Sequence, residues 1–179
     1  MQRSRSLSIA VIVAGVAGLL AGLAQFGTRD PVVHDHVEGT SAWPAHLVLT
    51  VVAVAWIAAI WWARRTGRAQ WLVPLNPIGA DARRRWAALR PIRLGTAARG
   101  AVAIVLFLVV IYGVWRAAEQ ITAGLDPNFT SNAWGGPSYL GAMYCHYLDG
   151  GLIMAVAAVL LKVVLPSGDR AGERHPTGV

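Results

Sequence analysis

Three chemically reactive side chains lie within one apolar stretch of the sequence. Cys145, His146 and Asp149 fall within five residues of one another in the run 139–164, which is otherwise typical of a membrane-spanning helix. Steps of three and four residues return to the same side of a helix, so the sequence predicts one polar face here. A carboxylate at the centre of a bilayer costs roughly 2.5 to 3.5 kcal/mol, and Asp149 is therefore expected to point inward toward a partner.

Candidate partners for this face come from two other apolar runs. His46 lies at the start of the second run, and Arg116 and Glu119 lie three residues apart at the end of the third. One interpretation is a structural polar cluster of Arg116, Glu119 and Asp149. In it Asp149 pairs with Arg116 or His146, and Arg116 pairs with Glu119 three residues on, so that the helices are held in register.

A metal site is the second interpretation. His34 and His36 flank an acid in an acidic loop, and with His46 and His146 they offer imidazole ligands on one side of the membrane. Imidazole and carboxylate ligands suit zinc, copper or iron better than magnesium or calcium. Neither a tight HxxxH nor a CxxC spacing is present, so the histidine pattern alone is a weak signal.

A redox or proton path is the third interpretation. Haem in a helical protein is commonly held by axial histidines from different helices, and His46 with His146 is the available pair. His146 and Asp149 would alternatively serve a quinone or a proton relay. The candidate cofactor-binding residues are thus His46, His146 and Asp149, with haem, a quinone or a transition metal as the ligand.

Catalytic and nucleic-acid-binding patterns have little support. There is no GxSxG elbow, phosphate-binding glycine loop or HExxH motif, and nothing resembles a groove-reading module. Cys145 and His146 are adjacent, and adjacent side chains of a helix point about 100° apart, which argues against a nucleophile and base pair. Cys145, the only cysteine, is expected to pack as a small apolar side chain. The sequence therefore favours a protein that is not an enzyme.

The elements that position these residues are predicted by hydropathy. The chain has 179 residues, of which 55% are hydrophobic and only 14% are charged, with a mean hydropathy of +0.49. Soluble domains carry about 25% charged residues, so a membrane protein is indicated. Four runs are near the roughly 20 residues that cross a bilayer. The expected fold is an all-α integral membrane bundle forming a single domain, 1–179, with transmembrane helices at about 7–26, 45–63, 100–118 and 139–164.

The charge distribution predicts the orientation of these helices. Of the 16 Lys and Arg residues, all but Arg29 and Arg116 precede the first run, lie between the second and third, or end or follow the fourth. The positive-inside rule then places both termini in the cytoplasm of a multi-pass cytoplasmic-membrane protein. The outer loops are expected at 27–44 and 119–138, the basic cytoplasmic loop at 64–99 and a cytoplasmic tail at 165–179. The pI of about 10.7 reflects this topology rather than nucleic-acid binding.

The first run allows two readings. A basic start and a small-residue site near Ala24 would suit a cleaved signal peptide over residues 1–24, although the apolar part is longer than usual. Ala10, Ala14, Gly18 and Gly22 are spaced four apart, and such a spine of small residues lets a neighbouring transmembrane helix approach closely.

The basic cytoplasmic loop contains one further expected element. Residues 81–90 predict a short helix that starts near an acid and stops before Pro91. Trp86 and Leu89 are expected to dip into the headgroup boundary while the arginines bind anionic lipids. Docking of this helix on a cytoplasmic partner is the alternative.

These observations favour a small bacterial membrane protein that serves as a non-enzymatic subunit or accessory protein, associated with other membrane subunits or with itself. Abundant Ala, Arg, Gly and Val indicate a GC-rich bacterial genome. The alternative function is a redox or metal-handling membrane protein.

Cysteine labelling tests the orientation. A cysteine introduced at Glu38 or Asn128 is expected to react from outside the cell, and one at Arg84 only after permeabilisation, because basic loops are retained in the cytoplasm. The reverse labelling pattern would contradict the placement of the polar residues on the outer side.

Overall fold

Four long helices dominate the structure. The computed structural model describes residues 4–90 and 93–167, and within these ranges every regular element is a helix. The long helices are α1 (Arg5–Gly27), α2 (Trp43–Thr66), α4 (Leu94–Ala123) and α6 (Tyr139–Val164), and each is long and apolar enough to cross a membrane. The prediction of an all-helical protein with four candidate spans is confirmed. The tail expected at 165–179 lies, from residue 168 onward, outside the described residues.

The helix bounds differ most from expectation in α4. Hydropathy placed this helix at 100–118, but it runs from Leu94 to Ala123. At its start the backbone N–H of Arg93 donates to Oγ1 of Thr96, which stabilises the first turn. At its end the helix continues through Glu119 and Gln120, which are buried although a loop was expected to begin at residue 119. Polar residues mark the end of an apolar run without ending the helix.

Three short elements lie between the spans. They are the 3₁₀ turn η1 (Gln70–Leu72), α3 (Ala80–Ala87) and α5 (Pro127–Thr130). The predicted short basic helix corresponds to α3, whereas α5 lies in a loop for which only turns were expected. Gly67 ends α2 with a φ of 71°, a left-handed conformation that glycine adopts without steric cost.

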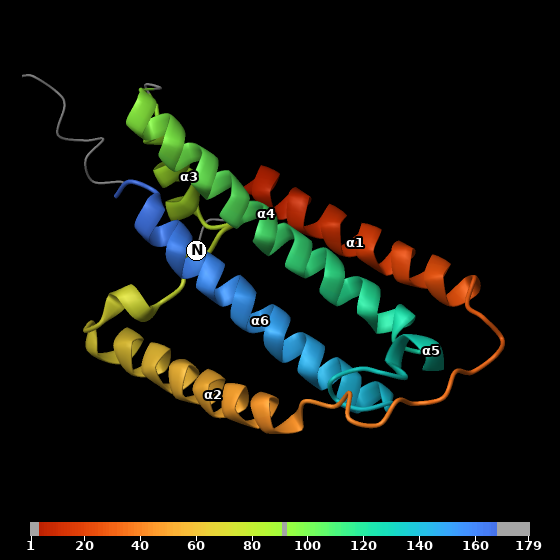
Figure 1. The fold of residues 1–179 in the computed structure, drawn as a ribbon. Coiled ribbons are helices and arrows are strands. Elements are labelled where there is room, and N and C mark those ends of the chain that lie inside the picture. The colour runs from red at the N-terminus through yellow and green to blue at the C-terminus, as the bar shows by residue number, and fades with distance from the viewer. Residues whose placement is uncertain (1–3, 91–92, 168–179) are drawn as a thin grey trace, which may run out of the picture.

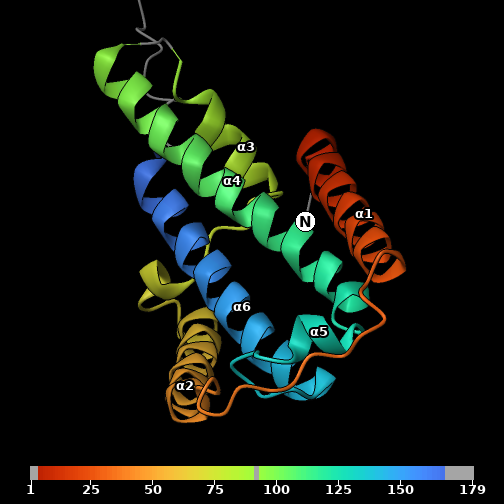
Figure 2. The same cartoon turned by 45° about the vertical axis from the view of Figure 1, so that its right-hand side comes forward.

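The four spans lie side by side in the order α1, α4, α6, α2 (Figure 1). α1 packs along α4, α4 packs along α6, and α6 contacts α2, so the first two helices of the chain lie at opposite edges of the row (Figure 2). One end of the row carries α5 and the starts of α2 and α6, and the other carries α3. These ends are called the α5 end and the α3 end below. The connection 28–42 therefore crosses the whole α5 end.

The contact between α1 and α4 depends on small residues. Ala14, Gly18 and Gly22 are the buried residues of α1. A Cβ atom at Gly18 would overlap the backbone carbonyl of Trp115, and one at Gly22 would overlap that of Glu119. The predicted spine of small residues is thus confirmed as a helix-packing face at Ala14, Gly18 and Gly22, with the two helices in contact at the level of their backbones, whereas Ala10 is only partly buried.

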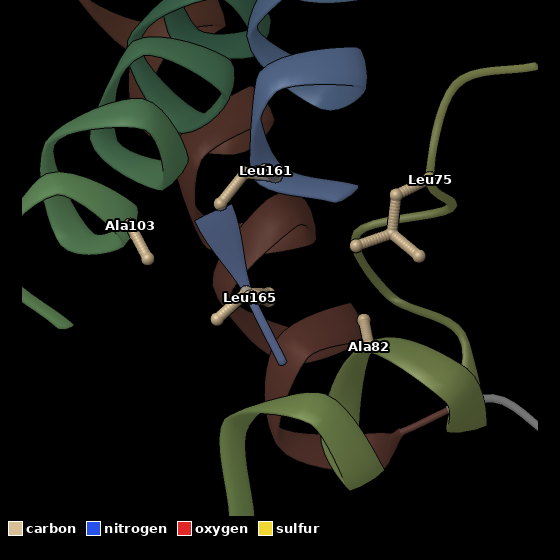
Figure 3. Close-up of a cluster of buried hydrophobic side chains, with 5 residues drawn as sticks. All are labelled: Leu75, Ala82, Ala103, Leu161 and Leu165. Carbon is tan, nitrogen blue, oxygen red and sulfur yellow. The ribbon is translucent and has the colours of Figure 1, made fainter. Parts of the chain in front are cut away.

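A hydrophobic cluster closes the α3 end. Its buried members come from α4, α6, α3 and the segment before α3, and they are Leu75, Ala82, Ala103, Leu161 and Leu165 (Figure 3). Trp86 and Leu89 pack against this cluster, and the Trp86 ring meets Phe107 edge-on at 6.3 Å between centroids. Part of the apolar surface of Trp86 and Leu89 thus docks α3 on the long helices, and the contact of these side chains with the headgroup boundary stays a prediction.

The segment 70–75 fills the space between α2 and α6 near the α3 end. Trp56 of α2 donates its indole N–H to the carbonyl of Leu72 at 3.1 Å. From α6, Lys162 donates to the carbonyl of Val73 at 3.1 Å, and the carbonyl of Ala158 accepts from the backbone N–H of Leu75 at 3.2 Å. The C-terminal half of α2 is thus joined to α6 through this segment.

Alanine substitutions at two nearby glycines test the α1 and α4 contact. Gly18→Ala is expected to lower the free energy of unfolding by about 1 to 3 kcal/mol, the usual cost of forcing extra atoms into a packed site. Gly15→Ala is the matched control, because its Cβ would meet only a Val114 methyl at 3.8 Å. Unfolding in mixed micelles followed by circular dichroism measures both, and equal stability of the two variants would contradict the close approach.

Candidate functional site

His46 and Asp149 form a pair between α2 and α6 in which the histidine is buried and the carboxyl group is partly exposed. The Nε2 atom of His46 lies 3.2 Å from Oδ2 of Asp149, and His46 is only 2% exposed. The other ring nitrogen, Nδ1, lies 2.8 Å from the carbonyl oxygen of Ala42, the residue that caps α2. A carbonyl oxygen only accepts, so Nδ1 carries a hydrogen. The contact between Nε2 and the carboxyl group then requires one further shared proton, on either partner.

Aromatic side chains surround this pair. The ring of Trp134 lies 5.8 Å from that of His46, between centroids. Nearby, Trp43 stacks on Tyr144 at 5.8 Å, and the Tyr144 hydroxyl is hydrogen-bonded to Thr50. These contacts join the start of α2 to the start of α6. They explain how α2, at the edge of the row, is fixed at the α5 end.

A second polar cluster joins α1 to α4. Glu119 is 1% exposed and forms an ion pair with Arg116, one helical turn earlier. Its other carboxylate oxygen, Oε1, accepts a hydrogen bond of 2.9 Å from the side-chain amide of Gln25 in α1. The Arg116 guanidinium also lies over the Phe129 ring, 5.4 Å from its centroid. A buried carboxylate is thus satisfied by a charge from its own helix and an amide from the neighbouring one.

The expected cluster of Arg116, Glu119 and Asp149 is divided between these two clusters, and among the described residues Asp149 does not pair with Arg116 or His146. Asp149 contacts His46 of α2, whereas Arg116 pairs with Glu119, and no contact between Arg116 and Asp149 is present among the described residues. The cause is the position of α6 between α4 and α2. Residues three apart on α6 point about 60° apart, which is enough for Asp149 to face one neighbour and His146 the other.

His146 lines two cavities that meet beside Arg116. One, of about 260 Å³, lies between α4 and α6. The other, of about 390 Å³, opens at the α5 end between α6 and the segment 128–134. The His146 ring contacts Phe129 at 6.4 Å between centroids, but within residues 4–90 and 93–167 it has no hydrogen-bond partner. Its ring nitrogens are therefore available to a ligand.

The loop histidines are held elsewhere. The Nε2 atom of His34 lies 3.6 Å from Asp30, and the backbone N–H of His34 donates to the side chain of Asn128. His36 contacts the carbonyl of Ser131 through Nδ1. His34 and His36 thus fasten the connection 28–42 to the α5 segment. In the part of the chain that the structure describes, no group of three or more His, Cys, Asp or Glu side chains is arranged to hold a metal ion.

The cavity at the α5 end has residues that the sequence did not indicate. Phe129, Asn132 and Trp134 line it, and the segment that carries them is packed on α6 where Gly135 and Gly141 approach each other. A Cβ atom at either glycine would overlap the backbone of the other. The Gly135-Gly136-Pro137 sequence is a turn signal, but it does not reveal this contact. Cys145, by contrast, is buried and unpaired as expected.

Comparison with known proteins gave no match. No protein-family model matches the chain, and no curated protein and no solved structure is significantly similar to it.

Neutralising each member of the Arg116 and Glu119 pair tests the buried cluster. Arg116→Gln is expected to destabilise the fold by about 3 to 5 kcal/mol, because it leaves the carboxylate of Glu119 buried without a counter-charge. Glu119→Gln should cost less, since the Arg116 side chain is one-third exposed and reaches water. The double variant should lose less than the two single losses added together.

Arg84→Gln is the control for this cycle. Arg84 is 70% exposed in its side chain, and exposed ion pairs contribute less than about 1 kcal/mol. Unfolding free energies in mixed micelles give all four values. Strict additivity of the Arg116 and Glu119 changes would contradict a direct coupling between the two groups.

Proposed function

We propose that the protein is a multi-pass cytoplasmic-membrane protein that serves as a non-enzymatic subunit or accessory protein, with both termini in the cytoplasm. The distribution of charge supports this orientation. Arg64, Arg65 and the arginines of α3 gather at the α3 end, while Asp35 and Glu38 lie in the connection across the α5 end. Basic segments are those that remain on the cytoplasmic side of a membrane.

The observation that carries the proposed role is the pairing of the ionisable side chains within the spans. Glu119 is satisfied by Arg116 and Gln25, and Asp149 by His46. Each cluster joins two helices and leaves no charged side chain unpaired within it. Polar groups inside a membrane protein commonly act in this way, as contacts that hold helices together.

The apolar edges of the row support association with other membrane proteins. Large side chains on the free sides of α1 and α2 are exposed, among them Ile12, Leu20, Val51 and Ile57. Each edge helix is covered by the rest of the chain on one side alone. Lipid, a second copy or another subunit would cover the remaining apolar surface.

A redox or metal-handling role is the second candidate, and one observation favours it. Metal-ligating histidines usually donate their second ring N–H to a backbone carbonyl or a carboxylate. His46 does so toward Ala42, with its Nε2 atom beside Asp149. A transition metal at His46 and Asp149, or haem held with His146, would use this geometry.

Purification in a gentle detergent separates the two candidates. The accessory role predicts protein without a haem absorption band and without stoichiometric zinc, copper or iron, together with copurifying membrane subunits. It also predicts that Asp149→Asn fails to fold or to assemble, because the contact between α2 and α6 is weakened. Asp35→Asn is the control, since Asp35 is exposed in the connection 28–42.

Visible absorption, elemental analysis and size-exclusion chromatography supply the measurements. If Asp149→Asn folds and assembles normally but loses a bound haem or metal, the accessory role of this cluster is wrong and the redox or metal-handling role is supported.

A further inference from the structure

The cavity between α4 and α6, called the α4–α6 pocket below, has one polar end and one apolar end. Arg116, Gln120 and His146 lie at the end nearer α5, because α4 approaches the α5 end as its residue numbers rise and α6 leaves it. Toward the middle of the spans the lining is apolar, with Val109, Gly113, Ile153 and Met154. From Val109 to Gln120 this corresponds to about 16 Å along α4.

The α4–α6 pocket is open to the surface of the row of helices. Tyr112 and Ile153 line it and are 60% and 58% exposed. On α6, Gly150 and Gly151 also line it, and a Cβ atom built at either one meets no atom within 4 Å. Two adjacent glycines thus leave free space where larger residues would fill the pocket. A lipid-soluble molecule can enter this space from within the bilayer.

The charges at the polar end favour an uncharged head group. The positive charge of Arg116 is already balanced by the buried Glu119. An anionic head would place a second negative charge beside that carboxylate in an apolar setting, where repulsion is poorly screened. A guanidinium has five N–H donors, so Arg116 still has donors for a neutral carbonyl oxygen after pairing with Glu119. The unpaired ring of His146 supplies another polar contact.

Flat surfaces line the pocket below the polar end. Gly150 and Gly151, which have no side chain, are part of the lining, together with Tyr112 and Tyr147. The Tyr147 ring is held in place because its hydroxyl donates to the carbonyl of Ala117 at 3.2 Å. Glycine backbone and aromatic rings suit a planar ring better than a branched head group.

We propose that the α4–α6 pocket binds an uncharged amphiphile of the prenylated quinone class. One ring carbonyl accepts hydrogen bonds at Arg116 and His146, the ring lies against the glycine backbone of α6, and the tail follows the apolar side chains into the bilayer. The proposal concerns binding, with no electron transfer implied. It holds whether or not the protein is an accessory subunit, because His46 and Asp149 are not part of this pocket.

Quenching of tryptophan fluorescence by decylubiquinone measures the binding in detergent micelles. Trp115 stacks on Tyr112 of the pocket at 5.7 Å between centroids, so a quinone bound there lies close to an indole. Saturable quenching above the level given by a micelle-soluble indole is expected. Decanoate, which has a similar tail and a charged head, is expected to compete only weakly.

Three variants locate the site. Gly150→Leu is expected to abolish saturable quenching by filling the pocket without disturbing the fold. His146→Phe keeps the ring that contacts Phe129 but removes a hydrogen bond, and binding should weaken about tenfold. Gly95→Leu is the control, because a Cβ atom at Gly95 also meets open space but lies at the α3 end. Its affinity should equal that of the wild type.

Circular dichroism confirms that each variant is folded before its binding is compared. Unchanged binding in a folded Gly150→Leu protein would overturn the placement of the site. Displacement of decylubiquinone by an equal concentration of decanoate would overturn the uncharged head group, and the absence of saturable quenching in the wild type would overturn the proposal as a whole. If Gly150→Leu does not fold, Gly151→Leu replaces it, because Gly151 meets the same open space.

Discussion

The α5 end of the molecule depends on the two contacts that satisfy the buried carboxylate of Glu119. A carboxylate removed from water must be paired and hydrogen-bonded, and both partners are supplied at close range. Arg116 comes from the same helix, and Gln25 reaches across from α1. That reach is short because Gly22 allows the two backbones to touch. The same ion pair fixes the guanidinium of Arg116 at the border of two cavities, so helix packing and the geometry of the candidate site have one origin.

The two edges of the row of helices are held to the rest of the protein by different contacts. α1 meets α4 along a spine of small residues, whereas α2 is joined to α6 by polar contacts at one end and by the segment 70–75 at the other. Van der Waals packing of backbones is the general way in which membrane helices associate, and polar pairs add to it. The two edges of the row are thus held by different kinds of contact, and the pair of His46 and Asp149 belongs to the α2 edge.

Local composition was enough to predict the four spans, because an apolar run of about 20 residues needs a helix to satisfy its backbone in lipid. The bounds of α6 agreed with expectation, since Ser138 accepts a hydrogen bond from the N–H of Gly141 at its start and Pro166 follows its end. The extent of α4 did not, because hydropathy cannot tell that Glu119 is buried with a partner.

The candidate site was only partly predictable. Helical periodicity identified Asp149 and His146 as inward-facing, but the order of helices in the row decides which neighbour each one meets, and hydropathy carries no such information. Likewise the two cavities beside Arg116 depend on tertiary packing, one on Gly150 and Gly151 and the other on the folded segment 128–134. His34 and His36 form contacts within the loops, an outcome set by the path of the connection across the α5 end.

The placement of α1 and α2 at opposite edges of the row has a consequence for biosynthesis. Helices of a membrane protein enter the bilayer in chain order, and packing follows insertion. The contact between Gly18 of α1 and the Trp115 backbone can then form only after α4 has been inserted. The contact between His46 of α2 and Asp149 can form only after α6 has been inserted. In a membrane, both helices would be surrounded by lipid during that interval, without a packing partner from their own chain. Their nearly uninterrupted apolar sequences suit such an interval, and the buried histidine of α2, His46, lies in the first turn of that helix.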